Sequence, residues 1–221
     1  MRQFLHNNSL SVVLFALFFF SLLGQSLTGH HELNQEQQEH GRPVVSFAEY
    51  LTTGHFVEAV FENWESEFLQ MAVYVVFTVF LFQKGSAESK DPDRIEPVDQ
   101  DPARMRDRPD VPWPVRRGGL ALTVYSHSLS LALLLLFVMS FVLHAAGGAA
   151  AYSQEQQMHG QPPVTMIEYL GTSRFWFESF QNWQSEFLSM GAVVVLSIFL
   201  RERGSPESKP VHSPHDETGN S

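Results

Sequence analysis

Apolar residues in this chain are gathered into a few runs that are almost free of charge, and this segregation limits what the chain can fold into. Residues 9–28 contain no charged side chain, and residues 120–146 contain only tyrosine and histidine as ionisable groups. At 1.5 Å per residue, a helix of about 20 residues crosses the roughly 30 Å hydrocarbon layer of a bilayer. Both runs are therefore predicted to span a membrane, and a large water-soluble core is excluded.

Two shorter apolar runs, residues 68–82 and 187–200, reach spanning length only if the polar residues before them continue the same helix. Starting at Asn63 and Asn182 gives spans over residues 63–82 and 182–200. Trp64 and Trp183 then lie at the headgroup level, where tryptophan is enriched. The predicted fold class is an all-α integral membrane protein with four transmembrane helices and short helices in the outward loops.

The two halves of the sequence resemble each other. Residues 9–90 align with residues 128–209 without a gap, and about 38 of about 82 positions are identical. The first apolar run has a counterpart in the middle of the chain that cannot be removed as a leader, so we expect it to remain in the membrane. The prediction is two parallel two-helix repeats, residues 1–84 and 120–203, related by an axis along the membrane normal.

The basic residues predict the orientation. All of the 14 lysines and arginines except Arg42 and Arg174 fall near the termini or between the repeats. The positive-inside rule makes the protein multipass with both termini cytoplasmic. The linker, residues 85–119, and the tail, residues 204–221, are expected to be disordered in the cytoplasm. The Gly-Ser-x-Glu-Ser-Lys sequence at the start of each is interpreted as a solvated helix end, with docking as the alternative.

Composition excludes several kinds of chemistry. The absence of cysteine excludes disulfides, thiolate nucleophiles and cysteine metal sites. The formal net charge of -10 argues against a nucleic acid partner. No Gly-rich phosphate loop, serine elbow or His-Glu-x-x-His sequence occurs. We therefore expect a protein without a cofactor that is not an enzyme.

A glutamate and a histidine four residues apart occur in each outward loop, a spacing at which two helices could hold a metal ion between them. Helix capping explains the same residues, with Asn34 or Ser153 as N-cap and glycine at C′. Capping is the preferred interpretation, and no metal site is predicted. The alternative metal ligands are Glu36, His40, Glu155 and His159.

Each outward loop continues with a capping box, Ser46-x-x-Glu49 or Thr165-x-x-Glu168, that is predicted to open a short helix. Long amphipathic helices are predicted to begin after Thr53 and Thr172. In the first of these helices the apolar residues share one face. Three acidic residues lie off that face: Glu58, Glu62 and Glu65.

The sequence Asn-Trp-x-Ser-Glu-Phe-Leu occurs at residues 63–69 and again at residues 182–188. It places a carboxylate just inside the outer membrane boundary, where ionisable groups usually face a cavity or a partner. We predict an outer-leaflet polar cluster, with interhelical hydrogen bonding and snorkelling as the alternative explanation. Its members are Glu67, Glu186, Asn63, Asn182, Gln25 and His144.

With these motifs, the tandem pairs of spans resemble a bacterial family of small multipass membrane proteins described as a domain of unknown function. The resemblance implies a bacterial plasma membrane and assigns no activity. Three hypotheses follow. The first is a non-enzymatic accessory or structural membrane protein, in contact with the lipid bilayer and with either a second copy or a membrane partner protein. The second is a small transporter or channel that uses the polar cluster. The third is a metal-dependent membrane enzyme.

Overall fold

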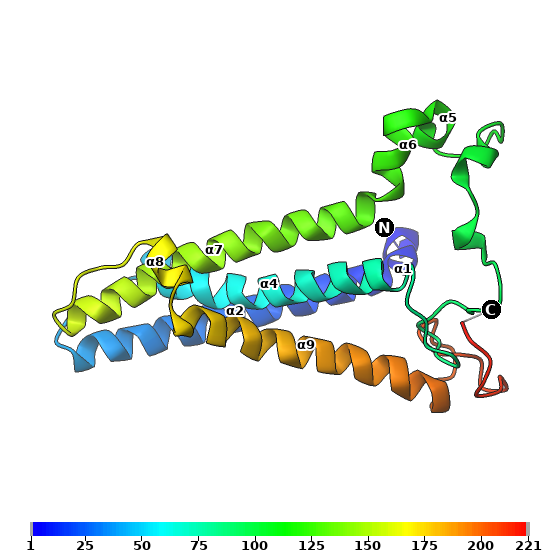
Figure 1. Cartoon of the computed structure of the whole chain (residues 1–221). Coiled ribbons are helices and arrows are strands. Elements are labelled where there is room, and N and C mark those ends of the chain that lie inside the picture. The colour runs from blue at the N-terminus through cyan, green and yellow to red at the C-terminus, as the bar shows by residue number, and fades with distance from the viewer. Residues whose placement is uncertain (1, 220–221) are drawn as a thin grey trace. The chain divides into compact units, whose positions relative to one another are not determined.

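The computed structural model describes residues 2–219, and within that range every regular element is helical (Figure 1). Four helices are long: α2 (Ser9–Glu39), α4 (Gly54–Phe77), α7 (Ser128–Met158) and α9 (Ser173–Phe199). The shorter elements are α1 (Arg2–Asn7), α3 (Phe47–Tyr50), η1 (Pro97–Asp99), η2 (Pro102–Met105), α5 (Trp113–Arg117), α6 (Gly119–Ser126) and α8 (Met166–Leu170).

The bounds of the long helices differ from the predicted spans at several ends. Helix α2 continues to Glu39 because residues 30–40 contain no glycine or proline that would end it before Gly41. The expectation of a separate short helix capped by Asn34 or Ser153 is therefore wrong, since both residues lie inside long helices. The predicted span 120–146 is divided at His127, which ends α6 before α7 begins. Helix α4 ends at Phe77, five residues before the predicted end at residue 82.

Two of these helices are long and apolar enough to cross a membrane. Helices α2 and α7 have 31 residues each and reach mean hydropathies of 2.1 and 2.4. Only 6% and 17% of their most apolar segments are buried. Helices α4 and α9 do not meet the same criterion, because their first halves carry charged and amide side chains.

The chain divides into two compact units, each formed from two separate stretches of sequence. Unit 1 comprises Met1–Phe61 and Val142–Trp176, and unit 2 comprises Glu62–Phe141 and Phe177–Ser221. Each unit therefore contains residues from both of the aligned halves. The predicted repeat and linker boundaries remain predictions.

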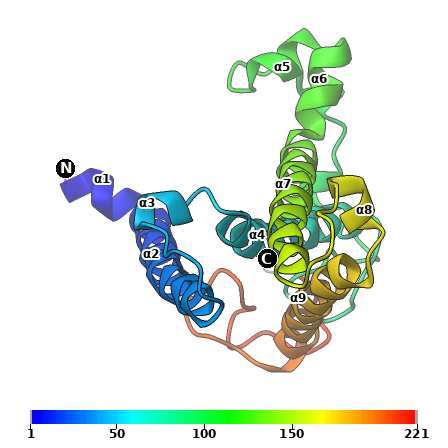
Figure 2. The same cartoon turned by 90° about the vertical axis from the view of Figure 1, so that its left-hand side faces the viewer.

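In unit 1 the aligned loops make matching local structures. Ser46 and Thr165 cap α3 and α8, and each forms the predicted capping box with the glutamate three residues later. Hydrogen bonds from both the side chain and the backbone of the capping residue lower the pKa of Glu49 and of Glu168. The capping boxes are confirmed, and in two views α8 lies beside the end of α7 (Figures 1 and 2).

The core of unit 1 is aromatic. Tyr50, Tyr169 and Phe175 are almost completely buried. The ring of Tyr169 lies 5.8 Å from Tyr152 and 5.6 Å from Phe175. Gly148 on α7 makes room for this ring, because a Cβ there would lie 2.6 Å from the Tyr169 hydroxyl oxygen. Helix α8 is thereby held against α7 through a tyrosine that fits over a glycine.

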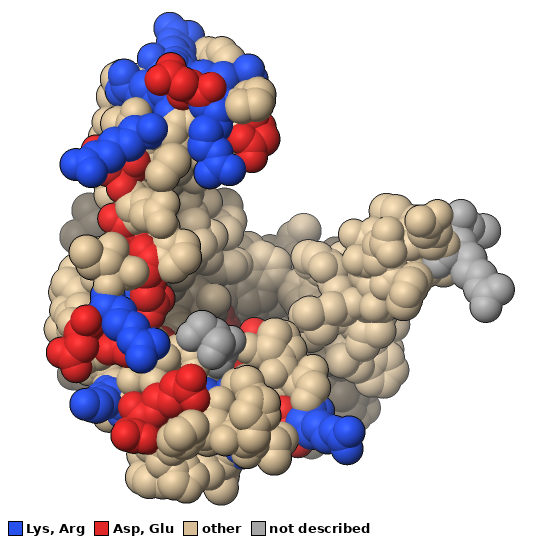
Figure 3. All heavy atoms as spheres, turned by 90° about the vertical axis from the view of Figure 1, so that its right-hand side faces the viewer, with Lys and Arg blue, Asp and Glu red and all other residues tan. Residues whose placement is uncertain are grey.

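In unit 2 the linker and tail carry charged side chains of both signs, and basic side chains are densest at the top of the view in Figure 3, where α5 and α6 lie. Between residues 85 and 117 the regular structure is limited to η1, η2 and α5. The buried residues of this unit include Val115 in α5, Leu122 in α6, and Ser86 and Lys209 in the Gly-Ser-x-Glu-Ser-Lys segments.

Candidate functional site: a polar seam between α4 and α9

Within unit 2, polar side chains of α4 and α9 join the two helices by hydrogen bonds. Asn182 Nδ2 donates to Glu62 Oε1 at 2.6 Å, and Trp183 Nε1 donates to Glu65 Oε1 at 3.1 Å. Further along, Gln70 Nε2 donates to the Glu186 carbonyl oxygen at 2.8 Å. The contacts advance in the same direction along both helices, so α4 and α9 run parallel here. We call this set the polar seam: Glu62, Glu65, Gln70, Asn182, Trp183 and the Glu186 carbonyl group.

Glu65 is the most buried member of the polar seam, with an exposed fraction of 0%. A carboxylate removed from solvent needs hydrogen-bond donors, because an unsatisfied buried charge costs several kcal/mol. The indole N–H of Trp183 is one such donor. The adjacent Ser66 is also buried, and its hydroxyl donates to the Asn63 carbonyl oxygen at 2.7 Å. The polar seam is therefore an internal contact between helices, on the side of α4 that carries the glutamates.

The sequence places the glutamates of α4 off its apolar face, and the hydrogen bonds of the polar seam show that this polar side of α4 is also packed against another helix. Glu58 is also buried, and in unit 1 the hydroxyl of Tyr169 donates to its Oε1 at 3.0 Å. Residues 58, 62 and 65 follow one another at helical spacing along one side of α4. The aligned positions in the second half are Phe177, Gln181 and Gln184, none of which is acidic. This difference between the halves is the sequence signal that could have set the three glutamates of α4 apart from ordinary solvent-facing charges.

The six residues of the predicted polar cluster fall in both units. In unit 1, Gln25 Nε2 donates to the Ala59 carbonyl oxygen at 3.2 Å. The buried ring of His144 stacks on Phe175 at 4.8 Å. In unit 2, Asn182 belongs to the polar seam, whereas Asn63 and Glu67 are exposed. The charge of Glu67 acts on Glu186, which is half-buried. Each unit thus holds part of the set.

The residues considered as metal ligands lie at the ends of α2 and α7. His40 and His159 follow the last helical residues, and the Nδ1 atom of each is 2.9 Å from the carbonyl oxygen four residues earlier. Gly41 and Gly160 come next with positive φ angles of 67° and 71°, so the C′ part of the capping interpretation is confirmed. The Glu155 carboxylate pairs with Arg174. Among residues 2–219, no three histidine or acidic side chains are grouped as a metal site would require.

The two Gly-Ser-x-Glu-Ser-Lys segments form the same turn. In each segment the hydroxyl of the first serine, Ser86 or Ser205, accepts a hydrogen bond from the backbone N–H of the glutamate two residues later. The hydroxyl of the second serine, Ser89 or Ser208, accepts one from the backbone N–H six residues earlier. The turns differ at the lysine. Lys90 pairs with Asp99 at 2.6 Å, whereas Lys209 is buried with an exposed fraction of 1%.

Lys209 Nζ donates to four backbone carbonyl groups of unit 2. The acceptors are the oxygens of Gly85 at 2.5 Å, Glu217 at 2.7 Å, His215 at 3.1 Å and Pro214 at 3.2 Å. We call this the carbonyl cage. Burial lowers the pKa of Lys209, the charge of Arg201 adds to the lowering, and Glu217 and Asp216 oppose it. The expectation of a solvated helix end is therefore wrong for this lysine.

The structure is that of an all-helical protein with two helices able to cross a membrane. The family described as a domain of unknown function, DUF6766, matches residues 1–220, and the chain belongs to this family. Comparison with curated proteins and with solved structures found no match.

Proposed function

We propose that the chain is a non-enzymatic integral membrane protein with four spans, located in a bacterial plasma membrane. The observation that carries the proposal is the exposure of α2 and α7. Phe20 on α2 is 77% exposed and Leu135 on α7 is 70% exposed, each within a long uncharged segment. Each such side chain costs about 1.5 to 3 kcal/mol when left in water. Lipid removes that cost without any protein partner.

The polar seam supports α4 and α9 as the remaining two spans. Their second halves, residues 68–77 and 187–199, contain no charged side chain. The glutamates that precede them would be costly in lipid. Hydrogen bonds from Asn182 and Trp183 reduce this cost by giving Glu62 and Glu65 donors inside the helix pair. The proposed spans place the polar seam at the outer boundary of the membrane.

We propose an accessory or structural role, in which the chain contacts a second copy of itself or another membrane protein. Three of the four acidic residues of α4 are used in packing, since Glu58, Glu62 and Glu65 all accept hydrogen bonds from other helices. Buried polar contacts of this kind hold helices together in lipid. These hydrogen bonds explain the presence of the three glutamates, so the proposal assigns them no catalytic role.

A small transporter or channel is the second candidate, and a different observation favours it. Glu67 is exposed on α4, and its charge acts on the half-buried Glu186 of α9. Two interacting carboxylates at membrane depth form a site that a proton or cation can occupy. Proton flux into liposomes, lost in the Glu67→Gln, Glu186→Gln double variant, would favour this candidate over the structural role.

Cysteine accessibility tests the four spans, because the chain contains no cysteine of its own. Single cysteines are introduced at exposed positions, one in each proposed loop or segment: Ala48, Asp107, Gln161 and Glu207. In sealed vesicles, an impermeant maleimide should label positions 48 and 161 from one side and 107 and 207 from the other. If only α2 and α7 cross, positions 48 and 107 will label from the same side, and the proposal is wrong.

A further inference from the structure

Arginines are concentrated in unit 2 where the linker meets α6, the helix that leads into the candidate span α7. Five arginines lie between residues 104 and 117, followed closely by Gly119 at the start of α6. We call this segment, together with Trp113, the arginine corner. Its arginines are Arg104, Arg106, Arg108, Arg116 and Arg117.

The arginine corner has a defined local structure. Helix α5 packs against both α6 and η2, and Val115 and Leu122 are buried there with exposed fractions of 7% and 9%. The chain turns from α5 into α6 at Gly118, which has a φ angle of 68°. The Arg106 guanidinium lies against this turn, so closely that a Cβ on Gly118 would be 2.6 Å from its Cζ. Arg106 is thereby placed at the turn that directly follows Arg116 and Arg117.

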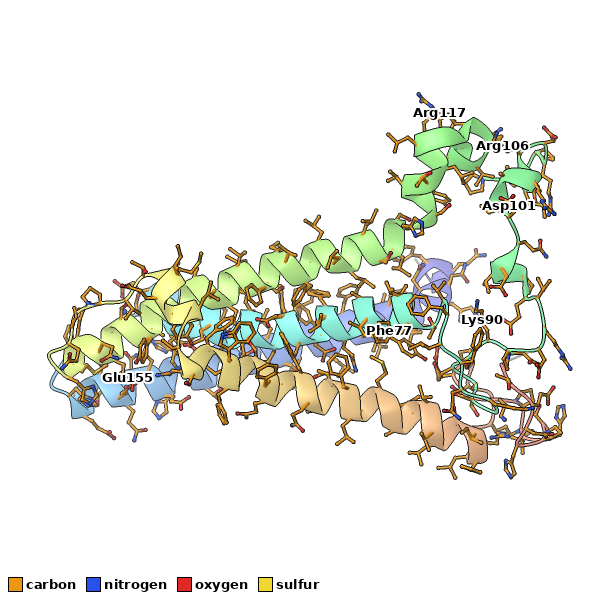
Figure 4. The ribbon with its side chains drawn as sticks, in the orientation of Figure 1. Phe77, Lys90, Asp101, Arg106, Arg117 and Glu155 are labelled. Atoms are coloured by element: carbon orange, nitrogen blue, oxygen red, sulfur yellow. The ribbon has the colours of Figure 1, made fainter. Side chains whose placement is uncertain are left out.

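The five arginines differ in whether an acidic side chain neutralises them. Arg104 lies 3.7 Å from Asp101, and Arg108 lies 3.5 Å from Asp110. Within residues 2–219, Arg106, Arg116 and Arg117 have no acidic partner, and all three are exposed. Figure 3 shows basic side chains crowding this part of unit 2, and Figure 4 labels Arg106 and Arg117. The arginine corner therefore presents three unneutralised guanidinium groups.

Apolar side chains lie beside these charges. Trp113 is 57% exposed, and the Arg117 guanidinium stands 5.1 Å from the centre of its ring. Leu120, in the first turn of α6, is 80% exposed. Tryptophan settles at membrane interfaces, where its ring meets acyl chains and its N–H meets headgroups. Arginine and tryptophan together at the start of an apolar helix fit the headgroup layer of a membrane.

We propose that the arginine corner binds the phosphate groups of anionic phospholipids through Arg106, Arg116 and Arg117, with Trp113 set among the headgroups. The inference rests on the proposed function, because it needs α7 to cross the bilayer. Guanidinium groups bind phosphate through paired N–H donors, and juxtamembrane basic clusters attract anionic lipid. The proposal adds a lipid class and a binding site to the proposed membrane protein.

The test uses the full chain in nanodiscs that contain phosphatidylcholine and phosphatidylglycerol, with one of the two carrying brominated acyl chains. Bromine quenches nearby tryptophan, and the difference between the parent and Trp113→Phe isolates the signal of Trp113. Each basic residue near an anionic surface contributes about a fivefold preference. We expect the Arg106→Gln, Arg116→Gln, Arg117→Gln variant to lose about 100-fold in the relative association of phosphatidylglycerol.

A matched control removes the same charge from arginines that have acidic partners. In the Arg94→Gln, Arg104→Gln, Arg108→Gln variant, each arginine replaced lies within 4.0 Å of an aspartate oxygen, so we expect a loss below about tenfold. Equal losses in the two variants, or equal quenching by the two lipids in the parent, would overturn the inference. So would preferential binding of RNA over phosphatidylglycerol vesicles.

Membrane insertion is measured separately, so that the two proposals can fail independently. Each variant is first expressed in cells, and its membranes are washed with alkaline carbonate. A parent chain that washes off would contradict the proposed function. A parent chain that stays in the membrane and shows no lipid preference would contradict only the lipid site.

Discussion

Replacing Gly148 by alanine is expected to destabilise the protein, although alanine is the better helix former. A Cβ at this position of α7 would lie 2.6 Å from the hydroxyl oxygen of Tyr169 and 2.7 Å from its Cζ. The ring has an exposed fraction of 0%, and its hydroxyl donates to Glu58 at 3.0 Å. Tyr169 cannot move away without losing packing and weakening this hydrogen bond.

The magnitude follows from two opposing effects. Overpacking of a tight core costs about 1 to 3 kcal/mol, and weakening the Tyr169 hydrogen bond without breaking it adds about 1 kcal/mol. The gain in helix propensity is at most about 1 kcal/mol. We expect a net loss of about 1 to 3 kcal/mol in the free energy of unfolding. At about 2 to 4 °C per kcal/mol for a chain of this size, Tm should fall by roughly 2 to 12 °C.

The control is Gly24→Ala on α2, where a Cβ would meet no other atom within 4 Å. This substitution should leave Tm unchanged or raise it by up to about 4 °C. Both variants are measured by far-ultraviolet circular dichroism melts in the same detergent. In a Tyr169→Ala background, Gly148→Ala should no longer destabilise. Equal shifts for Gly148→Ala and Gly24→Ala would refute the steric argument.

Three further predictions address the polar seam, the carbonyl cage and the capping boxes. Trp183→Phe removes the indole donor to Glu65 and should lower the free energy of unfolding by about 1 to 3 kcal/mol, measured by denaturant titration; an unchanged midpoint would contradict the role of that hydrogen bond. Lys209→Met should release the tail, measured as faster amide hydrogen exchange after residue 209; unchanged exchange would argue against the carbonyl cage. Glu49 and Glu168 have lowered pKa values, so their stabilising contribution is present above the ordinary glutamate pKa of about 4.3 and is lost as pH falls below it. The Tm of the Glu49→Gln, Glu168→Gln variant should therefore depend less on pH between about 5 and 3 than the Tm of the parent. Equal pH dependence of the two Tm values would contradict this prediction.

Local signals in the sequence predicted local structure well. The capping boxes at Ser46 and Thr165 formed as predicted, and the long helices α4 and α9 begin directly after Thr53 and Thr172. Such features depend on residues within one turn of each other, so a single stretch of sequence contains all the information. The four transmembrane spans remain a prediction, with α2 and α7 meeting the length and hydropathy criterion.

The polar seam could not be predicted in the same way, because its pairs are far apart in the sequence. An amphipathic reading of α4 places Glu62 and Glu65 toward solvent, as in a helix on a water-soluble protein. In the structure these residues face the donors Asn182 and Trp183 of α9. Their burial depends on which helix is the neighbour, and periodicity within one helix does not identify it.

The carbonyl cage joins one side chain, that of Lys209, to main-chain atoms only. Any residue type supplies a carbonyl oxygen, so the carbonyl cage does not restrict which side chains occupy positions 214 and 217, whereas the His215 ring also makes a hydrogen bond to the Ile198 carbonyl oxygen. Lys209 has no such freedom. The same contact shields its amine, so amine-reactive reagents should modify the exposed Lys84 and spare Lys209. Selective acylation followed by peptide mapping would report in intact cells whether the tail is docked.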